Sequence, residues 1–209
     1  MDHIAHWIFD LDNTLYPPEI RLFDQIEAKM EHYITRELGL DSAAANDLRA
    51  DFWHNHGTTL AGLMSVYNID PDPFLTEVHD IDITAIPRDP VLADAISALP
   101  GQRLIYTNGS RWHGENISTA RGVRPAFHAV YGIEDAGYVP KPHRDAFEAI
   151  VAKADIDPTR AVMIEDDPRN LKIPAEMGMT TILVGPPHDA PHIRHQTEDL
   201  AGLLSRLMA

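Results

Sequence analysis

The sequence predicts an α/β protein, a doubly wound parallel sheet that carries an inserted all-helical segment. From residue 90 onward, short runs rich in β-branched residues alternate with amphipathic stretches of helical period, which is typical of a parallel sheet covered by crossover helices on both faces. Residues 16–87, in contrast, contain about four helices in a row and no convincing strand. We therefore expect residues 1–15 and 88–209 to form an α/β core domain, and residues 16–87 to form a helical cap domain.

Each element has a local signal in the sequence. The first strand is an apolar run, Pro17 and Pro18 open the first helix, and glycines at positions 39, 57 and 122 end helices. Alternation of strand and helix resumes after Pro90. We expect strands at 4–9, 103–107, 129–131, 161–164 and 180–184, and helices at 20–38, 42–57, 60–67, 74–78, 91–99, 110–122, after 142, at 168–177 and at 200–207.

Composition and charge restrict the class of protein. A chain of 209 residues with 44% hydrophobic content can bury a sizeable core. Its formal net charge of -15 argues against binding to polymeric nucleic acid or to an anionic membrane surface, because both require a patch of Lys and Arg. The N-terminus has no basic region, no apolar run approaches the length of a membrane span, and cysteine is absent. We expect a soluble, cytoplasmic monomer or homodimer whose partner is a small molecule.

Polar residues follow several predicted strands at the point where each strand ends. Asp10 and Asp12 follow the first strand, and in a parallel sheet such carboxyl ends meet at one edge, where ligands bind. Two carboxylates this close repel each other, so a hard divalent cation, most simply Mg²⁺, is their natural partner. The same edge is expected to collect Thr107, Asn108, Gly109, Lys141, Glu165, Asp166 and Asp167.

Each of these groups also has a purely structural interpretation. Asp10-x-Asp12 can be a polar turn, Thr107-Asn108-Gly109 a common turn before an N-cap at Ser110, Lys141 a solvated lysine, and residues 165–167 a complement to a helix dipole. Four such coincidences would have to fall on the same edge of one sheet. Together the groups therefore favour a phosphate and metal site.

These motifs, in this order, resemble those of the haloacid dehalogenase (HAD) superfamily of phosphotransferases along the whole chain. Asp10-Leu11-Asp12-Asn13-Thr14 matches the first motif, Thr107 the second, Lys141 the third and residues 165–167 the fourth. The resemblance implies a HAD-like Rossmannoid core with a helical cap inserted after the first motif. It also implies an enzyme, a Mg²⁺-dependent phosphatase that acts through an aspartyl-phosphate intermediate.

The resemblance also implies a role for each matching residue. Asp10 would be the nucleophile and Asp12 the general acid and base. Mg²⁺ would be held by Asp10, the backbone carbonyl of Asp12 and Asp166, with Glu165 or Asp167 acting directly or through water. Thr107, Asn108 and Gly109 would bind the phosphate, and Lys141 would stabilise the transition state.

Within the superfamily, the chain looks like the pyrimidine 5′-nucleotidase branch. The resemblance rests on Asp-Leu-Asp-Asn-Thr-Leu-Tyr-Pro at 10–17, on residues 56–63 and on Tyr106-Thr107-Asn108-Gly109. It implies that His56, Thr58 and Thr59 contact the substrate, a pyrimidine nucleoside 5′-monophosphate, although His56 stands where an aromatic such as Tyr is expected. Thr58 and Thr59 can instead simply cap a helix.

Other functions stay open. A phosphoglycolate-type or sugar phosphate phosphatase is the main alternative within the superfamily. A phosphoacceptor signalling module would use a similar Asp, Thr and Lys set, but it has neither a helical insertion after the first strand nor a counterpart of Asp12. A haloacid dehalogenase is disfavoured, because hydrolysis of a carbon–halogen bond has no use for Asp12 or for a metal.

Five residues stand out less clearly. We expect Trp53 and Trp112 to pack in the core or in the cap. His113, three residues after Ser110, either touches the substrate or is a surface histidine. His54 and His56 are disfavoured as metal ligands, because a helix places residues i and i+2 on different faces.

Overall fold

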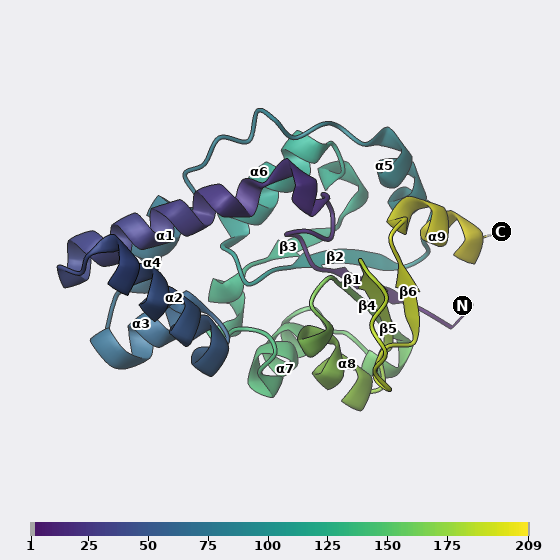
Figure 1. Cartoon of the computed structure of the whole chain (residues 1–209). Coiled ribbons are helices and arrows are strands. Elements are labelled where there is room, and N and C mark those ends of the chain that lie inside the picture. Colours follow the sequence, from purple (N-terminus) through teal and green to yellow (C-terminus); the bar gives the residue numbers. More distant parts are fainter. Residues whose placement is uncertain (1–2, 209) are drawn as a thin grey trace.

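The computed structural model describes residues 3–208, which fold around one six-stranded parallel sheet (Figure 1). The strand order is β3-β2-β1-β4-β5-β6, so β1 lies in the middle between β2 and β4. All neighbouring strands pair in parallel, which brings their carboxyl ends to one edge. The strands are β1 (His6–Phe9), β2 (Gln102–Tyr106), β3 (Ala129–Tyr131), β4 (Ala161–Glu165), β5 (Thr180–Val184) and β6 (His195–Thr197).

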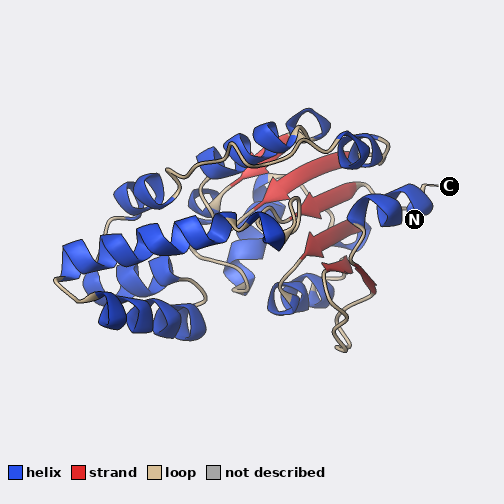
Figure 2. Ribbon diagram, turned by 45° about the horizontal axis from the view of Figure 1, so that its top comes forward, coloured by secondary structure: helices blue, strands red, loops and turns tan. Residues whose placement is uncertain are grey.

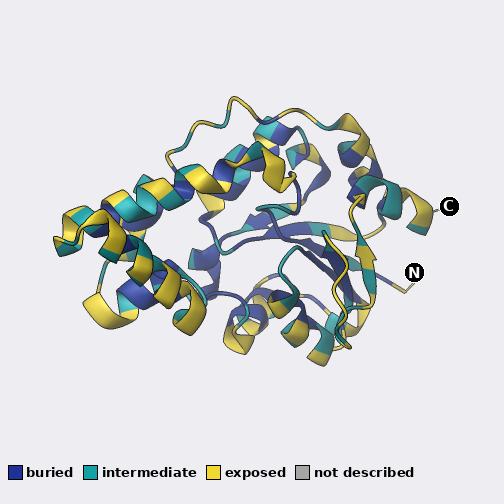
Figure 3. Ribbon diagram, in the orientation of Figure 1, coloured by how far each residue is buried: buried dark blue, intermediate teal, exposed yellow. Residues whose placement is uncertain are grey.

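Helices cover both faces of the sheet (Figure 2). Alternate residues of β1 point to opposite faces, so Trp7 and Phe9 join one hydrophobic cluster with α5, α6 and α9, whereas Ile8 joins another with α7. The central strands β1 and β4 are mostly buried, whereas the edge strand β6 and the outward faces of the helices carry exposed residues (Figure 3). The helices are α1 (Leu22–Leu38), α2 (Ser42–His56), α3 (Thr59–Tyr67), α4 (Pro71–Val78), α5 (Pro90–Ser97), α6 (Arg111–Arg121), α7 (Arg144–Lys153), α8 (Lys172–Glu176) and α9 (Leu200–Leu207).

Helices α1 to α4 follow one another without a strand and form what we call the four-helix layer, residues 22–78, beyond the carboxyl edge of the sheet (Figure 1). They share a hydrophobic cluster of their own, in which Tyr33 and Phe74 meet edge to face with ring centroids 5.0 Å apart. Gly39 ends α1 in the left-handed conformation, and the Asp41 side chain caps α2 by accepting from Ala44 N. The layer is thus a packed unit joined to the sheet through two chain crossings.

The predicted α/β architecture is confirmed, and most predicted elements appear within one or two residues of their expected bounds. Two expectations were wrong. The helix predicted at 168–177 is a 3₁₀ turn (Pro168–Leu171) followed by the short α8, because Pro174 lacks the N–H that a continuous helical ladder needs. Strand β6 was not predicted, because a three-residue polar edge strand has neither the length nor the apolar pattern of a strand.

Within residues 3–208, none of the helices combines the length and the apolar character that crossing a membrane requires.

Candidate active site

Three neighbouring strands deliver carboxylates and a hydroxyl to one point of the carboxyl edge. Asp10 follows β1, Thr107 follows β2, and Glu165 ends β4. Asp10 N still donates to Ile164 O at 2.8 Å, so the backbone of the first loop is fixed to the neighbouring strand where the side chain begins. The central position of β1 explains why the predicted residues from loops distant in sequence meet.

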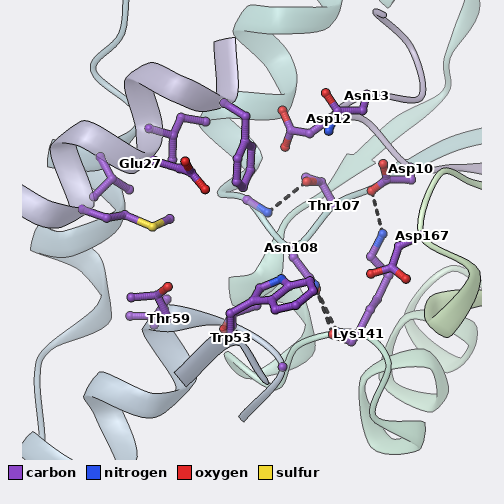
Figure 4. Close-up of a pocket in the computed structure, with 18 of the residues that line it drawn as sticks. Asp10, Asp12, Asn13, Glu27, Trp53, Thr59, Thr107, Asn108, Lys141 and Asp167 are labelled. Atoms are coloured by element: carbon purple, nitrogen blue, oxygen red, sulfur yellow. Dashed lines mark hydrogen bonds and ion pairs between the residues drawn. The ribbon is translucent and has the colours of Figure 1, made fainter. Parts of the chain in front are cut away.

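Lys141 is the centre of this group. Its Nζ donates to Asp10 Oδ1 at 2.6 Å (Figure 4). It also donates to Glu165 Oε2 at 2.7 Å and to Tyr106 O at 3.2 Å. The side chain is 1% exposed, so the solvated-lysine interpretation is excluded. Burial alone would lower the pKa of Lys141, but the two carboxylates outweigh it and raise the pKa above the ordinary range, so the group stays charged.

Asn108 fixes the position of Lys141. Its Oδ1 accepts from Lys141 N at 2.8 Å, and its Nδ2 donates to Lys141 O at 3.1 Å (Figure 4). Because its amide oxygen and its amide nitrogen both bond the Lys141 backbone, the Asn108 side chain holds the loop that carries Lys141 in place. At Thr107, Oγ1 accepts from Gly109 N at 2.9 Å and keeps its own proton to donate.

Three carboxylates could hold a metal ion. Asp10, Glu165 and Asp166 each offer an oxygen, and these oxygens lie within 4.8 Å of one another. Burial raises the pKa of each of the three to about 7, with Glu165 adding to the shift of Asp10, Asp166 to that of Glu165, and Asp10 to that of Asp166. Three carboxylates beside one ammonium carry a formal charge of -2, and such hard oxygen donors fit Mg²⁺.

Asp167 is not part of this carboxylate cluster and pairs with Arg169 instead. Both of its carboxylate oxygens accept from Arg169, with Oδ2 2.6 Å from Arg169 Nη2, and Oδ1 caps the following turn by accepting from Arg169 N. Of the two residues left open as additional ligands by the sequence, Glu165 therefore has the geometry for direct contact.

Asp12 has a different environment from Asp10. Its Oδ1 accepts from Tyr16 OH at 2.6 Å and lies 2.9 Å from His113 Nε2. Burial alone would raise the pKa of Asp12, but His113 and Tyr16 outweigh it and lower the pKa to about 2. His113 is 1% exposed, so the surface interpretation of this residue is wrong: it is a buried partner of Asp12.

A cavity of about 530 Å³ lies above these groups, between the carboxyl edge and the four-helix layer. The layer contributes apolar side chains such as Ile26, Met30 and Phe74, together with the ion pair of Arg49 Nη1 and Glu27 Oε1 at 2.7 Å. Figure 4 shows Glu27, Trp53 and Thr59 on one side of the cavity and Asp10, Asp12 and Lys141 on the other. The cavity thus has a charged floor and a mainly apolar roof.

Of the two expectations for Trp53 and Trp112, packing in the core is excluded, since they are 48% and 53% exposed. Trp53 lines the cavity, and the Arg169 guanidinium lies 3.9 Å from its ring centroid. Arg169 belongs to the 3₁₀ turn after β4. The cation–π partner of Trp53 therefore comes from the α/β part of the chain and not from the four-helix layer.

The three cap-helix residues expected at the substrate are placed unequally. Thr58 and Thr59 line the cavity, but Thr58 Oγ1 caps α3 by accepting from Ala61 N at 3.1 Å, and Thr59 Oγ1 donates to Arg49 O at 3.4 Å. His56 is half-buried, its ring edge to face with Phe52 at 5.3 Å, and it is not among the residues that line the cavity.

Sequence reasoning missed Tyr16 and His79 at the site. Tyr16 stands four residues after Asp12, a spacing that could have been tested as a loop contact. His79, which stacks on His113 and lines the cavity, follows α4, and only the folded chain brings it to this edge.

Residues 4–178 match the family model of the haloacid dehalogenase-like hydrolases. The chain belongs to this family. It is therefore an enzyme, a hydrolase, with the α/β fold of the family. The HAD motifs predicted from the sequence are the residues that meet at the carboxyl edge.

Solved HAD structures share the fold. A HAD phosphatase from Thermococcus onnurineus is 15% identical, with 98% of each chain covered and a TM-score of 0.65. A HAD-hydrolase from Bacillus subtilis bound to magnesium is also 15% identical, with 98% of each chain covered and a TM-score of 0.61. The L-2-haloacid dehalogenase from Xanthobacter autotrophicus is 16% identical over 99% of this chain and 100% of its own, with a TM-score of 0.60. At these identities the likeness concerns the fold.

Proposed function

We propose that the protein is a Mg²⁺-dependent phosphomonoester hydrolase that acts through an aspartyl-phosphate on Asp10. The observation that carries the proposal is the second carboxylate, Asp12, which lines the same cavity as Asp10 and is held by two hydrogen-bond partners. Hydrolysis of a phosphate ester requires a proton for the leaving oxygen and a base for water, and Asp12 is placed to provide both. A halide leaves without a proton, whereas an alkoxide leaving group needs one, so Asp12 favours the phosphatase over the dehalogenases of the family.

The protein residues have the following roles in this reaction. A carboxylate oxygen of Asp10 attacks phosphorus, and the leaving oxygen takes a proton from Asp12 as its bond to phosphorus breaks. Asp12 then removes a proton from water, which attacks the aspartyl-phosphate and releases inorganic phosphate. Lys141 orients Asp10 and offsets the negative charge that develops in the transition state. Thr107 donates its hydroxyl proton to a phosphate oxygen.

Asp10, Glu165 and Asp166, with the backbone carbonyl of Asp12, would hold Mg²⁺. When bound, the ion would supply positive charge to the carboxylate cluster and to the phosphate oxygens.

We propose further that the four-helix layer is a cap that selects a nucleoside 5′-monophosphate with a pyrimidine base. The exposed Trp53 indole offers a face for an aromatic ring, Thr58 keeps a hydroxyl proton to donate, and Arg49 with Glu27 adds polar groups to the apolar roof. A cavity of about 530 Å³ has the size of a small-molecule site. A phosphoglycolate or a sugar phosphate would leave the apolar roof without a partner.

A panel of esters tests the proposal. We expect phosphate release from UMP, CMP and p-nitrophenyl phosphate with Mg²⁺, and none in excess chelator. AMP and GMP should be poorer substrates, and phosphoglycolate and a hexose phosphate poorer still. Release of chloride from 2-chloropropionate without phosphatase activity would overturn the assignment, whereas a preference for phosphoglycolate would overturn only the nucleotide assignment.

A further inference from the structure

Two buried histidines stand beside Asp12, and neither has a role in the reaction described above. His113 lies in the first turn of α6, where its backbone N–H donates to the Ser110 Oγ cap at 3.1 Å. This cap directs the first turn of α6 so that His113 Nε2 reaches Asp12 Oδ1 at 2.9 Å. The imidazole is 1% exposed, so its position is set by packing and not by solvent.

The hydrogen bonds of Asp12 distinguish its two oxygens. Tyr16 OH and His113 Nε2 both contact Oδ1, at 2.6 and 2.9 Å. Within residues 3–208, Oδ2 has no hydrogen-bond partner, although Asp12 lines the cavity. A carboxylate held by two donors on one oxygen has a fixed plane, so the other oxygen is presented to the cavity in a defined direction.

His79 supports His113 from the other side. The two rings stack with centroids 4.3 Å apart and an angle of 18° between planes, and Ser110 Oγ lies 3.1 Å from His79 Nδ1. A Cβ at Gly109 would approach His113 Cδ2 to 3.1 Å and His79 Nε2 to 3.3 Å, so the absence of a side chain there makes room for the stack. His79 immediately follows α4, so the support comes from the end of the four-helix layer.

We propose that His113 is a positioning residue that holds Asp12 through Oδ1 and thereby directs Oδ2 at the leaving oxygen and at the attacking water. The inference rests on the proposed phosphatase function. In the first step, Oδ2 takes up the proton that the bound phosphate monoanion carries and passes it to the leaving oxygen as that oxygen separates from phosphorus. In the second step, Oδ2 takes a proton from the water that attacks the phosphorus of the aspartyl-phosphate on Asp10. In this proposal His113 transfers no proton to the substrate or to water.

The test compares single-turnover release of the leaving group from two aryl phosphates in Mg²⁺, with enzyme in excess. Phenyl phosphate needs a proton on its leaving oxygen, whereas p-nitrophenyl phosphate has a stabilised leaving group and needs it far less. In His113→Leu we expect release of phenol to slow by about 100-fold and release of p-nitrophenol by less than about threefold. His113→Gln should recover most of the phenol rate, because its amide nitrogen can take the place of Nε2.

Two controls separate positioning from general damage. His32→Leu, at an exposed position on α1, should leave both rates unchanged. His113→Asn keeps a polar side chain that is too short to reach Oδ1, so it should behave as His113→Leu even if the leucine variant folds poorly. In a background of Asp12→Asn, His113→Leu should cause little further loss, because contacts that act through one another are not additive.

Equal slowing of both esters in His113→Asn, or full additivity with Asp12→Asn, would overturn the inference while the phosphatase function stands. Failure of the wild-type enzyme to hydrolyse either ester in Mg²⁺ would overturn the proposed function, and the inference with it.

Discussion

Lys141 Nζ lies 2.6 Å from Asp10 Oδ1 at a place where the lysine is 1% exposed. The ammonium also contacts Glu165 at 2.7 Å, so one cation offsets two buried carboxylates. Lys141→Met would leave both carboxylates without that cation, and removal of one partner of a buried ion pair costs about 3–5 kcal/mol. We expect a correspondingly lower free energy of unfolding in denaturant titrations without metal, and loss of phosphatase activity.

Lys172→Met is the matched control, because Lys172 is exposed on α8. It should unfold at the same denaturant concentration as the wild type. Equal stability of the Lys141 and Lys172 variants would contradict the role assigned to the buried contact.

Asp10→Asn should remove turnover and preserve the fold, because an amide cannot act as the nucleophile. Asp12→Asn should differ, since Asp10 would still be able to attack an ester with a good leaving group. We expect an acid-stable phosphoenzyme to accumulate in Asp12→Asn with p-nitrophenyl phosphate and to be absent from Asp10→Asn, as measured by intact-protein mass spectrometry. Phosphorylation of Asp10→Asn would place the nucleophile elsewhere.

Asp166 and Asp167 are neighbours with different partners, so we expect their substitutions to change the Mg²⁺ requirement by different amounts. Asp166 belongs to the carboxylate cluster, whereas both oxygens of Asp167 are used by Arg169. Asp166→Ala should therefore raise the Mg²⁺ concentration needed for half-maximal activity much more than Asp167→Ala does. The reverse order would exclude Asp166 as a ligand.

The carboxylate cluster also predicts how stability depends on pH. Asp10, Glu165 and Asp166 have pKa values raised to about 7 in the folded protein, above those of the unfolded chain. Between about pH 4 and pH 7 the folded state thus binds more protons, so this contribution to stability is complete below about pH 4 and is lost as the pH rises through about 7. Without metal, the Tm should fall between pH 5 and pH 8.

Mg²⁺ competes with these protons, so it should raise the Tm more at pH 8 than at pH 5. Differential scanning calorimetry at both pH values, with Mg²⁺ or with chelator, provides the measurement. A Mg²⁺ effect that is equal at the two pH values would contradict a site built from these carboxylates.

Trp53 should contribute to the choice of substrate. Trp53→Leu removes the exposed indole at the cavity, so we expect KM for UMP to rise by about tenfold, in line with about 0.5–1.5 kcal/mol for an aromatic contact, while kcat/KM for a small alkyl phosphate stays unchanged. Equal losses of kcat/KM on both substrates in Trp53→Leu would exclude a role of Trp53 in substrate selection.

Thr59→Val should mainly lower stability, because the Thr59 hydroxyl contacts Arg49 O and is buried.

The site residues that the sequence predicted best are those that directly follow or end a parallel strand. Asp10, Thr107 and Glu165 each stand at the end of a recognisable strand, and parallel pairing places these ends together. Lys141 was assigned through the motif pattern, and its burial between two carboxylates supports that assignment. The sequence predicted that the strand ends share one edge, whereas the central place of β1 in the strand order came only with the structure.

The contacts that the sequence did not predict depend on side-chain direction. Whether His113 points inward or outward on α6 is set by the Ser110 cap and by the His79 ring, and neither has a periodic signal. Asn108 is a residue type common in turns, but its side-chain amide hydrogen-bonds the backbone N–H and carbonyl of Lys141. Trp53 is large and apolar, but its partner is a guanidinium across the cavity and not the core.

The two chain crossings between the sheet and the four-helix layer both pass beside Asp12. The outgoing crossing contains Asp12 itself, and the returning one begins with His79, which contacts Asp12 only through the His113 ring. A rotation of the layer about these crossings would move its far end most and the Asp12 carboxylate least. Under the proposed function, a change in the layer would alter substrate selection with little effect on the position of Asp12. An engineer could exchange residues 22–78 for another helical bundle to change which molecule is accepted, provided that Tyr16, His79 and His113 are retained.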